Sequence, residues 1–208
     1  TTDTPVDQLD LEPLAMEEEI AFVLNHANRF LGLQLRREDI RSVFAGLRPL
    51  IQGRRDNTAK LSRSHEVDAS ASGLVNVRGG KWTTYRKMAE DTVRFLRKKC
   101  GLEFVPADTS KRPLEMGSEA PRGLHPEDPK ALAAAVSKAV EEEMCVTTED
   151  FLARRYRTLF LDARAAAQAA PEVSRLLATA RSQDKAWEAA QIRAFEELAH
   201  HYLPANTP

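Results

Sequence analysis

The residues with the clearest chemical potential surround a pair of glycines, in the stretch Val77-Arg78-Gly79-Gly80-Lys81-Trp82-Thr83. Two consecutive glycines let the backbone turn sharply and approach a ligand closely, because no Cβ stands in the way. A helix is expected to begin just after them, capped by Thr83 or Thr84, and a helix N-terminus suits an anion or a polar cofactor edge. Lys81 adds a cation beside this turn. A strand–glycine–helix corner is also common without any ligand, and the G-x-G-x-x-G spacing of a dinucleotide site is absent.

Two arginines, Arg48 and Arg63, form a second candidate group. A guanidinium presents paired donors that match phosphate oxygens, and it stays charged at any relevant pH. Pro49 holds the residue before it in an extended conformation, so Arg48 is expected at the end of a strand. On the residues alone, two ordinary surface arginines among 30 basic residues are the simpler explanation.

The elements that position these residues are expected to be a short hairpin and two helices. Apolar spacing predicts strands over 61–67 and 74–77, joined by a turn, and the helix that follows the glycines ends at Gly101. Farther upstream, residues 17–31 form an amphipathic helix that Gly32 terminates. A β-leaning apolar segment lies around Val43–Leu47.

The second half of the chain reads as helical. Five prolines mark 102–129 as surface loops, after which Asp128 caps a helix that has Pro129 in its first turn. Thr147-x-x-Asp150 resembles a capping box, and the helix after it extends to about Phe160. Pro171 is expected to begin a short helix, and a last helix runs over about 184–202. Four such helices with short connections make a small bundle.

The predicted fold class is therefore α+β and mostly α, with a short antiparallel β segment followed by a C-terminal helical bundle. We expect residues 1–101 to belong to one domain, 102–121 to form a linker, and 122–208 to form the helical domain. A formal net charge of -1 gives no broad attraction for nucleic acid. The two cysteines, Cys100 and Cys145, form no metal or disulfide framework, which indicates a reducing compartment. No apolar run approaches the roughly 20 residues of a membrane span.

Three segments resemble one family when their order and spacing are considered together. They are Ser42-Val43-Phe44-Ala45-Gly46-Leu47-Arg48-Pro49-Leu50-Ile51, Leu61-Ser62-Arg63-Ser64-His65-Glu66-Val67 and Gly79-Gly80-Lys81-Trp82-Thr83-Thr84-Tyr85-Arg86. This pattern resembles FAD-dependent glycerol-3-phosphate dehydrogenase, the aerobic, respiratory enzyme. Residues 1–5 resemble the end of a strand of that family, and 142–144 and 150–155 resemble its helical tail domain. The resemblance covers nearly the whole chain and is densest between residues 42 and 89.

The resemblance implies roles for particular residues. Arg48 and Arg63 match arginines that hold the phosphate of glycerol 3-phosphate. The segment Gly80, Lys81, Trp82 and Thr83 matches one that lies against the pyrimidine side of the flavin. A positive charge and amide donors there stabilise the anionic reduced flavin. His65 is a weak candidate for the proton acceptor, because the family's proposed base lies upstream of this chain, and no catalytic residue or metal ligand is assigned.

The implied activity is oxidation of sn-glycerol 3-phosphate to dihydroxyacetone phosphate, with FAD and then a quinone as acceptors. The chain is expected to be a C-terminal piece without the N-terminal FAD-binding unit, and hence inactive alone. The implied location is cytoplasmic, with peripheral membrane contact and self-assembly left open. Two alternatives remain: a glycerol-3-phosphate oxidase that uses oxygen, and a helical association or membrane-docking module, whose basic cluster would be Arg154, Arg155 and Arg157.

Overall fold

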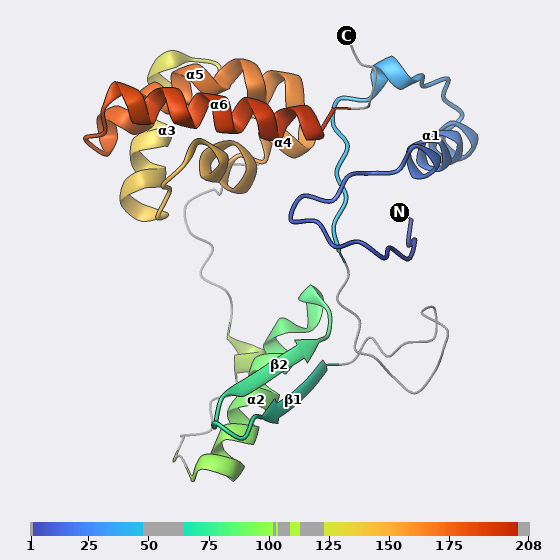
Figure 1. Ribbon diagram of the computed structural model, residues 1–208, viewed down its shortest axis with the longest axis vertical. Coiled ribbons are helices and arrows are strands. Elements are labelled where there is room, and N and C mark those ends of the chain that lie inside the picture. Colours follow the sequence, from blue (N-terminus) through green and yellow to red (C-terminus); the bar gives the residue numbers. More distant parts are fainter. Residues whose placement is uncertain (1, 48–64, 102, 104–108, 113–122, 204–208) are drawn as a thin grey trace. The chain divides into compact units, whose positions relative to one another are not determined.

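The computed structural model describes residues 2–47, 65–101, 103, 109–112 and 123–203, and the chain divides into two compact units (Figure 1). The helical unit comprises Thr1–Gly46 and Gly117–Pro208, and the hairpin unit comprises Leu47–Met116. The described elements are mostly helices, with one two-stranded antiparallel sheet. The predicted α+β, mostly α, fold class is therefore confirmed.

The hairpin unit is built from two strands and one long helix. Strands β1 (His65–Ala69) and β2 (Val75–Gly79) pair antiparallel, as predicted. The chain reverses between them through Gly73, whose φ of 85° is a conformation that glycine adopts readily. A 3-10 turn, η3 (Trp82–Thr84), leads into α2 (Tyr85–Cys100), and a second one, η4 (Thr109–Lys111), follows that helix. Gly101 ends α2 in the left-handed conformation, also as predicted.

The two faces of the hairpin differ in polarity. On one face Arg78 pairs with Asp68 and lies 3.7 Å from Glu66. The alternation of side chains in a strand directs His65 and Val67 to the other face, and α2 contacts both strands. No described residue of this unit is buried. A two-stranded hairpin is marginal in water without further packing, so its described part lacks the buried core of an independent domain.

The core of the helical unit lies in the C-terminal half. Its helical segments are α3 (Pro129–Glu142), the π-helical η5 (Asp150–Arg155), α4 (Thr158–Leu161), α5 (Ala163–Ala180) and α6 (Lys185–His201). Helix α5 packs against both α3 and α6 (Figure 1). Its fully buried alanines, such as Ala166 and Ala170, allow close approach, while Phe151 and Phe195 fill the larger volumes.

Side-chain caps begin several helices of this unit, and the caps at Asp128 and at Thr147/Asp150 confirm predictions. Asp128 and Asp184 each accept a hydrogen bond from the backbone N–H three residues on, at 2.7 and 2.8 Å. Thr147 N donates to Asp150 Oδ2 and Asp150 N donates to Thr147 Oγ1, both at 3.0 Å. This reciprocal pair is the predicted capping box, with aspartate in place of glutamate.

Two predictions about the helices are wrong. Pro171 lies inside α5 rather than at the start of a helix. Proline cannot donate to the carbonyl four residues earlier, but this position is exposed, and the buried Ala170 and Val173 keep α5 packed. The helix expected to reach Phe160 is broken at Arg157, whose φ of 51° separates η5 from α4.

The N-terminal helix is confirmed as α1 (Glu17–Leu31), followed by Gly32 with φ of 64°. Three glutamates in its first turn interact favourably with the positive end of the helix dipole. Arg37 forms an ion pair with one of them, Glu17, at 2.6 Å. Arg37 begins the 3-10 turn η1 (Arg37–Asp39). Ile20 is buried, but much of the apolar face of α1, including Phe30 and Leu31, is exposed.

Residues 41–44 connect to the helical segments through consecutive contacts. These contacts are Ala163 N to Arg41 O, Ser42 Oγ to Leu159 O, Val43 N to Tyr202 O, and the ring of Phe44 edge-on to Phe160. The prediction of a strand over Val43–Leu47 is therefore wrong. The Val43 N–H donates to the carbonyl of Tyr202, directly after α6, instead of to a neighbouring strand. The contacts also group residues 1–46 with the helices, whereas the sequence-based division places 1–101 together. That division of a longer polypeptide stays a prediction.

Candidate functional site

The glycine turn is confirmed as a tight connection between β2 and η3. Gly79 and Gly80 have φ of 68° and 83°, which side chains disfavour. A Cβ added to Gly80 would lie 2.6 Å from Met88 Sδ and 3.2 Å from His65 Cβ. Glycine is thus favoured at position 80 chiefly by its backbone conformation, and a Cβ there would also displace the end of the Met88 side chain.

The three residues after the turn are directed to solvent. Lys81, Trp82 and Thr83 are all exposed, Trp82 by 88%. The Trp82 ring stacks on Tyr85, with centroids 6.0 Å apart and an interplanar angle of 30°. Within the described residues the Lys81 ammonium has no hydrogen-bond or ion-pair partner. The turn therefore presents an exposed cation that no described residue pairs, an aromatic face and the first N–H groups of a helix.

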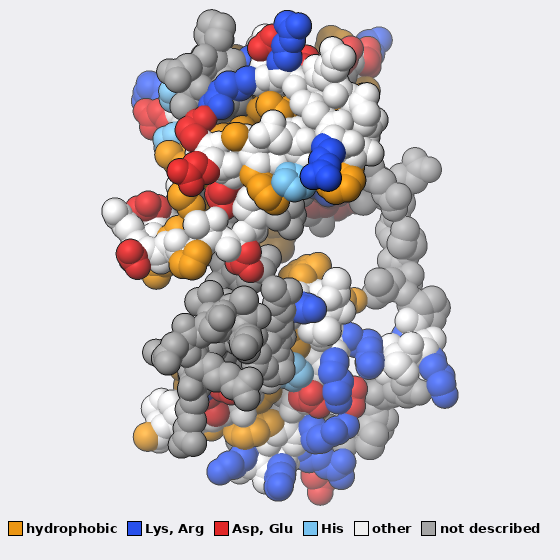
Figure 2. Space-filling model, turned by 90° about the vertical axis from the view of Figure 1, so that its right-hand side faces the viewer, with side chains coloured by type: hydrophobic (Ala, Val, Ile, Leu, Met, Phe, Trp, Pro, Cys, Tyr) orange, Lys and Arg blue, Asp and Glu red, His pale blue; other side chains and the backbone are white. Residues whose placement is uncertain are grey.

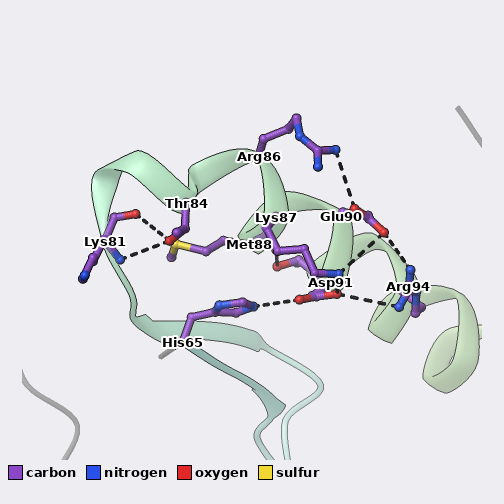
Figure 3. Close-up of polar contacts among 10 residues, drawn as sticks. His65, Lys81, Thr84, Arg86, Lys87, Met88, Glu90, Asp91 and Arg94 are labelled. Carbon is purple, nitrogen blue, oxygen red and sulfur yellow. Dashed lines mark hydrogen bonds and ion pairs between the residues drawn. The ribbon is translucent and has the colours of Figure 1, made fainter. Parts of the chain in front are cut away.

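Thr84 fixes the start of the helix in a way that differs from the predicted cap. Its hydroxyl donates to Lys81 O at 2.9 Å and accepts from Lys81 N at 3.3 Å (Figure 3). Thr84 N also donates to Lys81 O at 2.9 Å. These bonds close the 3-10 turn and hold the Lys81 backbone, instead of capping α2.

A histidine–carboxylate pair lies under the turn. His65 Nε2 of β1 is 3.0 Å from Asp91 Oδ2 of α2, and the two side chains are 17% and 28% exposed (Figure 3). Lys87 Nζ lies 2.8 Å from Asp91 Oδ1. The hydrogen bond from Lys87 lowers the pKa of Asp91, partial burial opposes it, and His65 lowers the pKa further. The carboxylate is thus ionised near neutral pH and accepts from both neighbours.

Positive charge surrounds this site. Figure 2 shows Lys and Arg side chains gathered over the hairpin unit. Those on α2 are exposed: Arg86, Lys87, Arg94, Arg97, Lys98 and Lys99. Glu90 and Asp91 neutralise part of this charge, since Arg94 lies 2.7 Å from Glu90 and 3.9 Å from Asp91. The remaining positive potential favours an anionic ligand.

These features fit the pyrimidine edge of a flavin. That edge is rich in carbonyl and ring nitrogen acceptors and carries negative charge when the flavin is reduced, so amide donors and a lysine suit it. Lys81 and the N–H groups of Trp82 and Thr83 would hold it. Because Gly80 has no side chain, a ligand can approach the backbone of the turn closely.

The predicted phosphate-binding residues, Arg48 and Arg63, lie outside the described residues, so their roles stay predictions. The sequence did not point to Asp91 as a partner of His65, because residues 26 apart reveal their contact only in the folded chain. The acid is visible in the sequence only as the i+4 neighbour of Lys87, a spacing typical of a surface ion pair.

Elsewhere, the helical unit contains a polar hollow of about 490 Å³ lined by Glu38, Asp39, Arg41, Asp162, Arg164, Ala165 and Gln168. Across it Arg41 lies 3.2 Å from Asp162, the residue that caps α5. In the described part of the chain no group of three or more His, Cys, Asp or Glu side chains converges as around a metal ion. None of the described helices has the length and hydropathy to cross a bilayer.

Two arginines of the basic cluster in the helical unit, Arg154 and Arg155, are engaged within the chain. Arg154 lies 2.6 Å from Glu149 and 3.2 Å from Asp150, and Arg155 donates to the carbonyl of Glu143. The ion pairs of Arg154 reduce the charge that an anionic surface would meet, whereas Arg157 is exposed.

Comparison with known proteins identifies relatives of this chain. Residues 103–189 match the C-terminal domain of alpha-glycerophosphate oxidase. Mitochondrial glycerol-3-phosphate dehydrogenase of Bos taurus is 31% identical over 98% of this chain and 34% of its own length. The Homo sapiens protein is 32% identical over 85% of this chain and 31% of its own length. Glycerol-3-phosphate dehydrogenase 2 of Mycobacterium bovis is 45% identical over 51% of this chain and 17% of its own length.

A solved structure shows the same fold. Glycerol-3-phosphate dehydrogenase from Bacillus halodurans, complexed with FAD, superposes with a TM-score of 0.72 at 23% identity. The match covers 100% of this chain and 49% of that one. This chain spans about a third of the length of the mitochondrial relatives. The chain is thus homologous to the C-terminal portion of glycerol-3-phosphate dehydrogenases and carries the C-terminal domain found in alpha-glycerophosphate oxidase.

Proposed function

We propose that this chain forms the C-terminal part of a flavoenzyme that oxidises sn-glycerol 3-phosphate to dihydroxyacetone phosphate. The observation that carries the proposal is the similarity to mitochondrial glycerol-3-phosphate dehydrogenase along 98% of the chain. In this reaction the bound FAD accepts a hydride from the substrate, and a quinone then receives the electrons. The catalytic base belongs to polypeptide outside these residues.

The residues of the chain have two tasks in this proposal. Gly80, Lys81, Trp82 and Thr83 contact the pyrimidine side of the flavin, where the Lys81 ammonium stabilises negative charge. The exposure of these side chains and the lack of a described partner for Lys81 support this role. Arg48 and Arg63 bind the substrate phosphate with paired guanidinium donors.

The phosphate contact is tested in the full-length protein that contains this chain. Replacing Arg63 or Arg48 with alanine removes a charged hydrogen-bond donor worth about 1.5–3 kcal/mol, which corresponds to a fall of roughly 10- to 150-fold in kcat/KM for glycerol 3-phosphate. Arg97→Ala is the matched control, since this exposed arginine on α2 has no described partner. An unchanged kcat/KM in both Arg48→Ala and Arg63→Ala would refute the phosphate site.

The isolated chain is expected to be inactive and to bind no FAD tightly. The hairpin unit has no buried residue among those described, and its two-stranded sheet leaves strand edges without partners in the described part. A pale preparation after desalting supports this expectation. A yellow preparation that retains a flavin spectrum would contradict it.

Oxygen is the alternative electron acceptor. The domain that matches residues 103–189 is named for alpha-glycerophosphate oxidase, and this name is the observation that supports the second candidate. The test is peroxide formation by the full-length protein during turnover in air. Stoichiometric peroxide identifies an oxidase, and quinone-dependent turnover without peroxide identifies a dehydrogenase.

A further role for the helices is association, either as a homo-oligomer or at a membrane surface. The helical unit supports it with a core of its own and with exposed apolar side chains on α1. The pairing of Arg154 with Glu149 and Asp150 weakens the membrane variant. Light scattering of the whole chain and its co-sedimentation with anionic vesicles test the two variants, and a monomer that ignores vesicles removes both.

A further inference from the structure

We infer that His65, tethered by Asp91, is a positioning residue that supports the glycine turn and thereby places Lys81. This inference deepens the proposed flavin contact and rests on it for its functional meaning. Its structural part depends only on the contacts within the hairpin unit. Neither residue touches the flavin in this account, so both act through the turn.

The first observation is the position of His65 directly below the turn. In the antiparallel register His65 pairs with Gly79. Its Cβ lies 3.2 Å from where a Cβ of Gly80 would stand, so the histidine forms part of the surface on which the turn rests. Met88 forms the rest, and Figure 3 shows its side chain reaching from α2 toward the turn.

The second observation is the tether that fixes the imidazole. Because an ionised carboxylate only accepts hydrogen bonds, His65 Nε2 donates to Asp91 Oδ2 across 3.0 Å. Asp91 is itself held by Lys87 at 2.8 Å on the same helix. The pair therefore joins β1 to α2 at the end of the hairpin where the turn begins (Figure 3).

The third observation is that Glu90, the acid beside Asp91, has no such role. Its carboxylate lies 2.7 Å from Arg94, 3.6 Å from Arg86 and 3.7 Å from Lys87, all on α2 itself. It therefore offers a matched control: replacing Glu90 removes the same charge from the same helix but no contact to β1.

The positional part is tested by amide hydrogen exchange in the 208-residue chain. Thr84 N donates to Lys81 O, and Tyr85 N donates to Trp82 O, so both amides report on the turn. We expect Asp91→Ala to speed the exchange of these two amides about 10-fold, which corresponds to a decrease of about 1.4 kcal/mol in their opening free energy. Glu90→Ala should leave their exchange unchanged, as should Asp91→Asn, which keeps an acceptor oxygen. Equal effects of Asp91→Ala and Glu90→Ala would overturn the inference.

The functional part is tested by FAD binding to the full-length protein, which is independent of turnover. His65→Ala and Asp91→Ala should raise the Kd for FAD about 10-fold. His65→Gln should restore binding, because its amide nitrogen can take the place of Nε2 as the donor. In the hydrogen-exchange experiment, the amides of α5 serve as an internal reference for correct folding of each variant.

The outcomes separate this inference from the proposed function. A wild-type protein that binds no FAD refutes the proposed function and, with it, the functional part. Wild-type FAD binding that is unaffected by His65→Ala and Asp91→Ala overturns the positioning role alone.

Discussion

Replacing Gly80 with alanine should destabilise the hairpin unit for two separable reasons. The φ of 83° would hold an L-residue in a left-handed conformation, which costs about 1–2 kcal/mol. In addition, the new Cβ would meet Met88 Sδ at 2.6 Å and His65 Cβ at 3.2 Å, and overpacking of this kind costs about 1–3 kcal/mol. The Met88 side chain is flexible at its end, so the steric part falls toward the lower limit.

The hairpin supplies a control that separates the two costs. Gly73 has a similar φ of 85°, but a Cβ added there meets nothing within 4 Å. Gly73→Ala should therefore show only the conformational cost. The double variant Gly80→Ala/Met88→Ala removes the nearest obstacle, and Gly80→Ala in that background should cost little more than Gly73→Ala.

Amide hydrogen exchange of β1, β2 and α2 is the appropriate assay, because unfolding of the chain need not be a single transition when two units are present. The opening free energy of these amides should fall most in Gly80→Ala and less in Gly73→Ala. Equal losses in the two single variants, or no relief from Met88→Ala, would refute the steric argument.

Three further predictions concern the helical unit. Met144 is 85% exposed with φ of 55°, so Met144→Gly should raise the stability of the unit by roughly 0.5–1 kcal/mol in thermal unfolding, and Met144→Ala should leave it unchanged. Thr148 and Ser174 share a buried hydrogen bond of 2.7 Å, so Thr148→Val should cost about 1–3 kcal/mol in denaturant unfolding, and adding Ser174→Ala should recover part of it. Burial raises the pKa of Asp150, but hydrogen bonds from the backbone N–H groups of Val146 and Thr147 outweigh this effect. The pKa of Asp150 is therefore lowered. Its stabilisation is therefore present above its ordinary pKa of about 4 and is lost as pH falls through the lower folded value, so the fall of Tm with acid should be shallower in Asp150→Asn.

The sequence predicted those parts of the fold that local physics determines. Gly32 and Gly101 end their helices where a left-handed residue is needed, and Asp128 begins its helix by capping. These signals act over three or four residues, so they are readable without knowledge of the fold. The antiparallel hairpin was predictable for the same reason.

The parts that the sequence did not predict depend on tertiary contacts. Pro171 reads as a helix start, but burial of its neighbours in α5 overrides that tendency. Val43 has a β-branched side chain typical of a strand, but its N–H bonds to Tyr202 at the far end of the chain. In the candidate site, the glycine turn was predictable from Gly79 and Gly80, whereas its support by His65 was not.

In the proposed function, this chain completes a flavin site that oxidises glycerol 3-phosphate. The most direct measurement adds sn-glycerol 3-phosphate without oxygen to the full-length protein and follows the visible absorbance of its flavin. The account predicts rapid loss of that absorbance in the wild-type protein and a much slower loss in Lys81→Met. A full-length protein that carries flavin but shows no substrate-dependent bleaching would contradict the account.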